Sequence, residues 1–109
     1  MALVKKKVTS IKWPVTISSP ADGGKWKDET YTGTFKKVGI KQIEELADKG
    51  DPQLIKEVLE DWKDINDEDG NEIPFSSEEL DLFLDDVNFI KGTVKAIIEM
   101  QKGASEKNS

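Results

Sequence analysis

The sequence predicts an α+β fold in which an N-terminal antiparallel β-hairpin packs on a small bundle of about four helices. Three observations predict it. Apolar and polar side chains alternate over residues 11–17, and the apolar period becomes helical after Gly39. Further on, Ser76 and Glu79 have the spacing of a capping box, which starts a helix.

The chain is expected to form one domain, because 109 residues can bury a single modest core but not two. We place this domain at residues 1–103, with the hairpin at 8–38 and the helical part at 39–103. Residues 104–109 are small and polar, so we predict a disordered tail there.

The first strand is predicted where alternate residues are apolar, namely Ile11, Trp13, Val15 and Ile17. Pro14 lies within this run and cannot donate to a ladder, which favours an edge position. The cluster from Ser18 to Gly24 contains serine, proline and glycine, and we expect it to end the strand.

The second strand is predicted between Trp26 and Val38. One face of it would carry Tyr31, Gly33 and Phe35, and the other Thr30, Thr32 and Thr34. An isolated hairpin is marginally stable in water. We therefore expect the face with Trp13 and Phe35 to cover the helices.

Two helices are predicted next. The first has the apolar stripe Ile40, Ile43, Leu46 and Ala47 and ends at Gly50. Asp51 and Pro52 then supply a cap residue and a first-turn proline, and the second stripe comprises Leu54, Ile55, Val58, Leu59 and Trp62. At this spacing we interpret Trp62 as a core or rim residue rather than a stacking platform for a ligand.

The region 60–86 is strongly acidic, with twelve acids against one base, Lys63. The sequence does not fit an EF-hand calcium loop. With Gly70 at loop position 6, ligand positions 1 and 12 are occupied by Ile65 and Ser76, which cannot replace the required carboxylates. We expect no metal site. Residues 69–71 are instead predicted to form a turn in which the glycine takes positive φ, followed by a short extended piece at 73–75.

The third helix is predicted to begin at the Ser76 cap. Its apolar stripe would be Leu80, Phe83, Leu84 and Val87.

The last helix is predicted to be capped by Asn88. One face carries Ile90, Val94, Ile97 and Ile98, and beside it lie Phe89, Thr93, Ala96 and Met100. This arc is wider than a surface helix of a small domain needs, which indicates either deeper burial or a contact with a partner. We take Phe89, Thr93, Ala96 and Met100 as the candidate partner-binding residues.

The composition argues against several kinds of chemistry. The chain has no cysteine and no histidine, which removes disulfides, thiolate nucleophiles, imidazole bases and nearly every zinc site. The carboxylates of Asp67, Glu68 and Asp69 fall in a polar turn, whereas a catalytic pair needs an apolar pocket that separates the two pKa values. We expect no enzymatic activity and no cofactor.

Membrane and nucleic-acid binding are also not expected. No apolar run approaches the roughly 18 residues of a membrane span, and the N-terminal charges follow the apolar residues, the reverse of a secretory signal. We therefore predict a soluble, unexported protein. The chain lacks arginine, on which nucleic-acid readers depend for bidentate contacts.

Charge is divided unevenly along the chain. Residues 1–43 carry nine lysines and three acids, a net +6, whereas residues 44–109 carry seven lysines and nineteen acids, a net −12. Such polarity favours association with an oppositely charged partner or, head to tail, with another copy of the chain.

The order of the sequence segments along this chain resembles that in the tail assembly chaperones of long-tailed bacteriophages. The resemblance covers most of the chain and is carried by WPVTI at 13–17, TGTFKKV at 32–38, WKDI at 62–65, DEDGNEIPFS at 67–76, the segment 80–84 and EKN at 106–108. It implies a small α+β protein that binds the tape measure protein and keeps it soluble. It also implies help in recruiting tail tube subunits, action in the host bacterial cytoplasm and absence from the mature virion.

A helix-in-groove contact with the apolar arc of the last helix would suit a long helical tape measure protein. The alternative is an acidic DNA mimic that occupies a DNA-binding protein, suggested by the net −11 of residues 60–86. A solvated acidic face is the simpler explanation of that charge.

Overall fold

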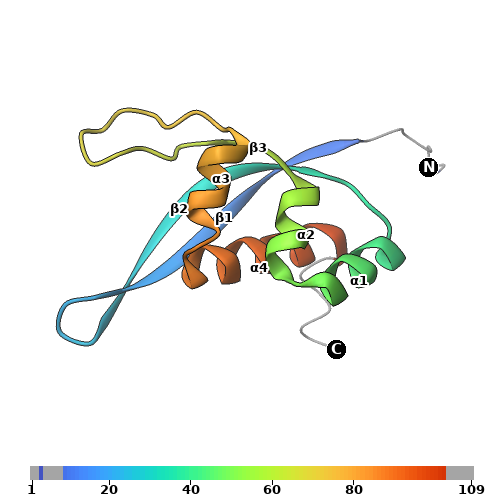
Figure 1. Ribbon diagram of the computed structural model, residues 1–109, viewed down its shortest axis with the longest axis horizontal. Coiled ribbons are helices and arrows are strands. Elements are labelled where there is room, and N and C mark those ends of the chain that lie inside the picture. Colours follow the sequence, from blue (N-terminus) through green and yellow to red (C-terminus); the bar gives the residue numbers. More distant parts are fainter. Residues whose placement is uncertain (1–2, 4–8, 103–109) are drawn as a thin grey trace.

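The computed structural model describes Leu3 and residues 9–102 and has the predicted α+β architecture (Figure 1). Helices pack against a three-stranded antiparallel sheet. In chain order the elements are β1 (Ser10–Ala21), β2 (Lys25–Lys36), α1 (Ile40–Lys49), α2 (Asp51–Val58), β3 (Leu59–Lys63), α3 (Ser77–Phe83) and α4 (Val87–Lys102).

The predicted hairpin is formed by β1 and β2, with Val15 paired to Tyr31. It is longer than expected, because β1 continues through Ser18 to Ala21 instead of ending at the serine cluster. The reversal is made at the very end of that cluster by Gly23 and Gly24, whose φ angles of 82° and 73° are left-handed. Glycine adopts such angles without steric cost, so the turn needs no earlier break in the strand.

The strand order β1-β2-β3 confirms that Pro14 lies on an edge strand. A Cβ placed on Gly92 of α4 would lie 2.4 Å from the backbone oxygen of Thr16, so this oxygen points away from β2 and towards α4. Backbone groups alternate along a strand, and Pro14 and Pro20 therefore place their nitrogens on the same outer edge. Neither proline removes a hydrogen bond from the ladder, which explains why the strand tolerates both.

The strand β3 was not predicted. The second helix ends at Val58, and Leu59–Lys63 pairs with β2, where Trp62 lies opposite Gly33. A register shift opposite Thr34 and Phe35 leaves one extra residue in β3. This bulge brings both Leu59 and Trp62 to the buried face, so their spacing of three imitates a helical stripe.

The core lies between the inner face of the sheet and the helices. β1 and β2 contribute the predicted face, with Phe35 fully buried, Tyr31 buried and Trp13 partly buried against the core. Trp62 is a core residue, as interpreted from the sequence. Its indole packs edge-on against the rings of Phe75 and Phe83, and its Nε1 donates to the Ile73 oxygen at 2.8 Å. The remaining buried apolar residues are Val15, Ile43, Leu46, Leu54, Ile55, Val58, Leu59, Leu80, Phe89, Ala96 and Ile97.

The first helix buries a narrower stripe than predicted. Ile43 and Leu46 are buried, but Ile40 and Ala47 are exposed. Gly50 ends α1 as expected, with a φ of 115°. The same glycine is the N-cap of α2, so Asp51 is the first helical residue rather than the cap.

The third helix starts as predicted, because the Ser76 hydroxyl accepts from the Glu79 amide at 3.1 Å. The predicted stripe is wrong at its last position. The helix ends at Phe83, and Val87 begins α4 with its side chain exposed. The cap expected at Asn88 is supplied instead by Asp86, whose carboxylate accepts from the Asn88 amide at 2.9 Å.

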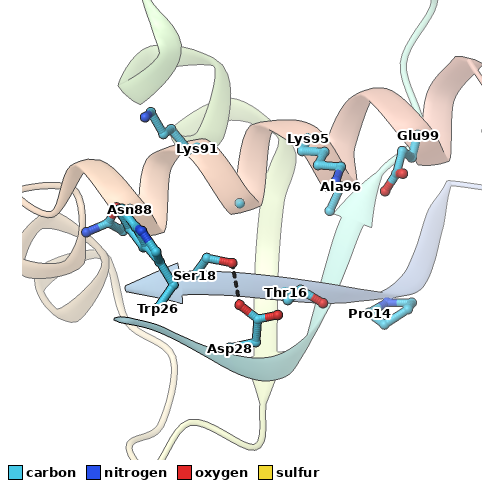
Figure 2. A pocket seen from close by; sticks show the side chains of 11 residues that line it. Pro14, Thr16, Ser18, Trp26, Asp28, Asn88, Lys91, Lys95, Ala96 and Glu99 are labelled. Atoms are coloured by element: carbon cyan, nitrogen blue, oxygen red, sulfur yellow. Dashed lines mark hydrogen bonds between the residues drawn. The ribbon is translucent and has the colours of Figure 1, made fainter. Parts of the chain in front are cut away.

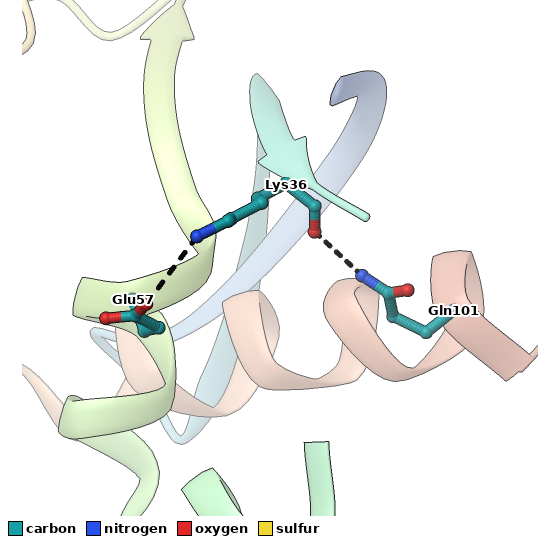
Figure 3. Close-up of polar contacts among 3 residues, drawn as sticks. All are labelled: Lys36, Glu57 and Gln101. Atoms are coloured by element: carbon teal, nitrogen blue, oxygen red, sulfur yellow. Dashed lines mark hydrogen bonds and ion pairs between the residues drawn. The ribbon is translucent and has the colours of Figure 1, made fainter. Parts of the chain in front are cut away.

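The C-terminal end of α4 is fixed to the sheet by Gln101 (Figure 3). Its amide nitrogen donates to the Lys36 oxygen at 2.9 Å, and its amide oxygen accepts from the Val38 nitrogen at 3.2 Å. Lys36 also pairs with Glu57 at 3.6 Å, but both side chains are close to half exposed, so this ion pair contributes little stability. The predicted tail at 104–109 lies outside the described residues.

Candidate protein-binding site at the free edge of the sheet

The site begins with an unpaired stretch of β2. β3 covers only the part of β2 from Thr32 to Phe35, whereas the residues from Lys25 to Tyr31 pair with β1 alone. Since Thr32 and Thr34 pair with β3, the alternation of backbone groups directs those of Trp26, Asp28 and Thr30 to the same, uncovered side. These three residues are exposed. We call the residues from Lys25 to Tyr31 the free edge.

The chain leaves this edge at Asp64, where φ is 68°. A left-handed angle is unfavourable for most residues but tolerated by aspartate, and here it turns the backbone out of the sheet after Lys63. The carboxylate of Asp64 accepts a long hydrogen bond of 3.4 Å from the Thr32 hydroxyl. Had the chain continued straight, β3 would have covered the rest of β2.

The acidic loop that follows is held by its own backbone. The Ile73 amide donates to the Ile65 oxygen at 2.8 Å, and Gly70 adopts the predicted positive φ of 84°. The Asp67 carboxylate accepts from the amides of Asp69 and Asn71, both at 2.9 Å. Asp67 therefore organises the turn in which it lies. Figure 1 shows this loop and the hairpin projecting at the same end of the molecule.

A hollow of about 220 Å³ lies beside the free edge, between the hairpin, the start of the acidic loop and the junction of α3 and α4. Its apolar lining consists of Ile17, Tyr31, Ile65, Phe83 and Phe89, and the acids Glu29, Asp64 and Asp86 also line it. Within residues 9–102 none of these three acids forms an ion pair. We call this space the acidic hollow.

The apolar part of the acidic hollow is a stack of aromatic rings. Phe89 stacks on Tyr31 with centroids 5.6 Å apart and on Phe83 with centroids 5.1 Å apart. The Tyr31 hydroxyl is hydrogen-bonded to the Thr93 hydroxyl at 2.8 Å. Burial raises the pKa of Tyr31 well above its ordinary value, and the bond to Thr93 offsets this only in part. The tyrosine is therefore neutral, and the charge of the hollow is set by the acids.

A second hollow, of about 540 Å³, lies on the opposite face of the hairpin against α4 (Figure 2). It is lined by Lys91 and Lys95 from α4 and by Trp26 and Asp28 from β2. The Asp28 carboxylate accepts from the Ser18 hydroxyl at 2.5 Å. Its lining carries both acidic and basic side chains, so it indicates no particular class of ligand.

The four candidate residues predicted on α4 do not form a surface. Phe89, Thr93 and Ala96 are each at most 3% exposed, and Met100 is partly buried against the core. Gly92 lets this side of α4 approach β1, while Ile97 packs in the same core. Deeper burial therefore accounts for most of the wide apolar arc of α4, while Ile98 on the same helix remains 40% exposed. Among the four, only Phe89 reaches the acidic hollow.

The residues that do form the site were not singled out from the sequence. In the sequence, Glu29 and Thr30 resemble the ordinary polar end of a strand. Ile65 attracts notice only as a residue that cannot be a calcium ligand. The sequence contains one signal for the free edge. The β-rich run that forms β2 is longer than a short neighbouring strand can cover. That neighbouring strand is β3, and the sequence predicts a helix for those residues, so the uncovered part of β2 could not be located.

The described residues contain no group of three or more acids placed to hold a metal ion. No helix within this part of the chain is long and apolar enough to cross a membrane. Comparison of the chain with protein-family models, curated proteins and solved structures gives no match. The free edge and the acidic hollow are therefore the features of this chain that indicate a function.

Proposed function

We propose that this chain is a tail assembly chaperone of a long-tailed bacteriophage, which binds the tape measure protein and helps recruit tail tube subunits. The observation that carries the proposal is the free edge next to the acidic hollow. An exposed strand edge binds an extended segment of another protein through main-chain hydrogen bonds, and a neighbouring apolar hollow selects its side chains. The resemblance of the sequence to this family names the partner.

The charge distribution supports the same role. A chaperone that holds an aggregation-prone protein must keep the complex soluble, and acidic side chains do this effectively. The acidic loop between Asp64 and Glu72 lies next to the hollow and would remain in water when a segment is bound. We place this activity in the host bacterial cytoplasm, before the virion is complete.

An acidic DNA mimic is the second candidate, and the projecting acidic loop is the feature that favours it. A mimic needs carboxylates that are free to replace phosphates. Asp67 instead holds the amides of its own turn, and Asp81 pairs with Lys56 at 3.2 Å. These engagements weaken the mimic hypothesis, and its salt dependence separates it from the chaperone.

The test is co-expression with the tape measure protein encoded in the same phage or prophage genome. We expect the soluble fraction of the tape measure protein to rise several-fold with the wild-type chain. Thr30→Pro removes an amide from the free edge and leaves the β1 ladder intact, so it should abolish the rise. Ser77→Ala changes an exposed residue of α3 outside the site and serves as the control.

Salt provides the second readout on the purified complex. Raising salt from about 0.05 to about 0.5 M should weaken binding by less than tenfold, because main-chain and apolar contacts are not screened. A steep loss with salt, together with sensitivity to Glu68→Gln and Asp69→Asn, is the result expected of a DNA mimic. An unchanged soluble fraction would show that this chain is not the chaperone of that tape measure protein.

A further inference from the structure

We propose that the acidic hollow and the free edge of one copy bind the N-terminal segment of a second copy, residues 3–8, as an added strand. This inference goes beyond the proposed function and does not depend on it. The segment reads Leu3-Val4-Lys5-Lys6-Lys7-Val8. Leu3 is 98% exposed, so its own chain provides no cover for this apolar side chain.

The alternation of side chains in an extended segment matches the site. In a strand, Leu3, Lys5 and Lys7 point to one side and the residues between them to the other. With that side turned inward, the leucine meets the aromatic part of the acidic hollow. The two lysines then lie along the acids that line it, Glu29, Asp64 and Asp86.

Charge complementarity favours this occupant. Glu29, Asp64 and Asp86 all line the acidic hollow, and none of them forms an ion pair among the described residues. A segment with three consecutive lysines supplies positive charge to these carboxylates. Residues 1–43 carry a net +6 and residues 44–109 a net −12, so the overall charge distribution also favours contact between the N-terminal part of one copy and the C-terminal part of another.

Topology directs the contact to another copy. The beginning of β1 pairs with the end of β2, at Ser10 and Lys36, whereas the free edge lies towards the tip of the hairpin. Figure 1 shows these two places towards opposite ends of a molecule that is 50 Å long. To reach its own site, the segment would have to reverse just before Ser10 and pass β3, which occupies that edge of β2 up to Thr32. A second copy meets no such obstacle.

The resulting contact is heterologous, since the donating and receiving surfaces differ. Heterologous contacts build rings when the rotation closes and open chains when it does not. Each copy in such an assembly both donates a segment and receives one. Donor and acceptor defects can therefore be placed in separate molecules, which gives a direct test.

The experiment uses sedimentation velocity on the purified full chain from about 10 µM to about 1 mM. We expect the average mass to rise with concentration above the 12.2 kDa of one chain. Leu3→Asp should weaken association by about tenfold or more, because it places a charge against the aromatic rings. Val4→Asp is the matched control, with the same change on the opposite side of the strand, and should weaken association much less.

The acceptor is tested with Thr30→Pro. The outer edge of β1 already contains Pro14 and Pro20, so an outward proline is compatible with this hairpin. Glu29→Lys, at an exposed residue that lines the hollow, is a second acceptor variant whose fold does not depend on backbone tolerance. Each acceptor variant alone should stay monomeric at concentrations where the wild-type chain associates.

Mixing a donor-defective variant with an acceptor-defective variant tests whether the two surfaces bind each other. Leu3→Asp keeps its acceptor site and Thr30→Pro keeps its donor segment, so an equimolar mixture should form a dimer of twice the single mass although neither variant associates alone. A chain that stays monomeric at about 1 mM would overturn the proposal. So would equal effects of Leu3→Asp and Val4→Asp, or a mixture that fails to dimerise.

Discussion

Tyr31 is the residue at which the sheet, the core and the acidic hollow meet. Its ring stacks on Phe89, its hydroxyl is bonded to Thr93, and it also lines the hollow. No buried side-chain nitrogen or oxygen among the described residues lacks a hydrogen-bond partner, which includes this pair. A single buried hydroxyl pair thus ties β2 to α4 below the site.

The raised pKa of Tyr31 predicts a loss of stability in alkali. In the unfolded chain the phenol has its ordinary pKa of 10.0, whereas burial in the folded chain keeps it protonated to higher pH. Its contribution is complete below pH 10.0 and is lost as pH rises from there through the folded pKa, because the unfolded state then binds fewer protons. Urea melts between about pH 7 and about pH 11 would measure this loss.

Tyr31→Phe is the control, because it removes the ionising group and keeps the ring. At neutral pH it should cost about 1 kcal/mol, since Thr93 loses its partner. Its stability should then fall less steeply than that of the wild type above pH 10.0. Parallel curves for the two proteins would show that other groups cause the alkaline loss.

Local signals in the sequence predict a helix or strand correctly wherever a residue type dictates the backbone conformation. Gly50 and Gly70 stop or turn the chain where positive φ is needed, and Ser76 starts α3. The β1–β2 hairpin and four helices were predicted for this reason. β3 was missed because its bulge gives Leu59 and Trp62 the spacing of a helix. The α3–α4 junction was misplaced because the stripe through Val87 has no visible break.

The candidate site was less predictable than the fold for a physical reason. A free edge is defined by what does not lie beside it, and that depends on where β3 ends in space. Only Phe89 among the residues chosen from the sequence lines the acidic hollow. An apolar arc on α4 cannot distinguish a buried face from a binding face, since both lower their free energy by leaving water.

Removing the cap of α3 should cost about 1 kcal/mol of the free energy of unfolding. In Ser76→Ala the Glu79 amide loses its side-chain acceptor, and this helix is only seven residues long. Ser77→Ala changes the neighbouring exposed serine, which makes no side-chain bond in the structure, and should be nearly neutral. Thermal melts should therefore separate the two variants by about 4 °C. Equal melting temperatures would mean that the end of α3 is frayed in solution.

The part of the hairpin that forms the core is separate from the part to which we assign binding. The half near Phe35 is covered by β3 and the helices, whereas every residue of β2 from Lys25 to Thr30 is exposed. An isolated two-stranded ribbon contributes little to folding. The length of twelve residues per strand therefore requires another explanation, and the proposed binding of a partner segment would supply one.

A shortened hairpin tests this division. Deleting Ser18, Ser19, Lys27 and Asp28 removes two cross-strand pairs together, so the glycine turn and the register of the remaining pairs are kept. The melting temperature should change by less than about 4 °C, because three of the four residues are exposed and none belongs to the core. Binding of the tape measure protein should fall by about tenfold or more, since the free edge loses the backbone groups of Asp28.

Ser18→Ala is the control for the shortened hairpin, because it removes the hydrogen bond to Asp28 at full strand length and should leave binding intact. The two readouts separate the possible failures. A large fall in melting temperature would show that the exposed half of the hairpin supports the core after all. Unchanged binding with an unchanged melt would place the partner elsewhere on the molecule, since a strand added to β2 cannot be indifferent to the length of the edge that receives it.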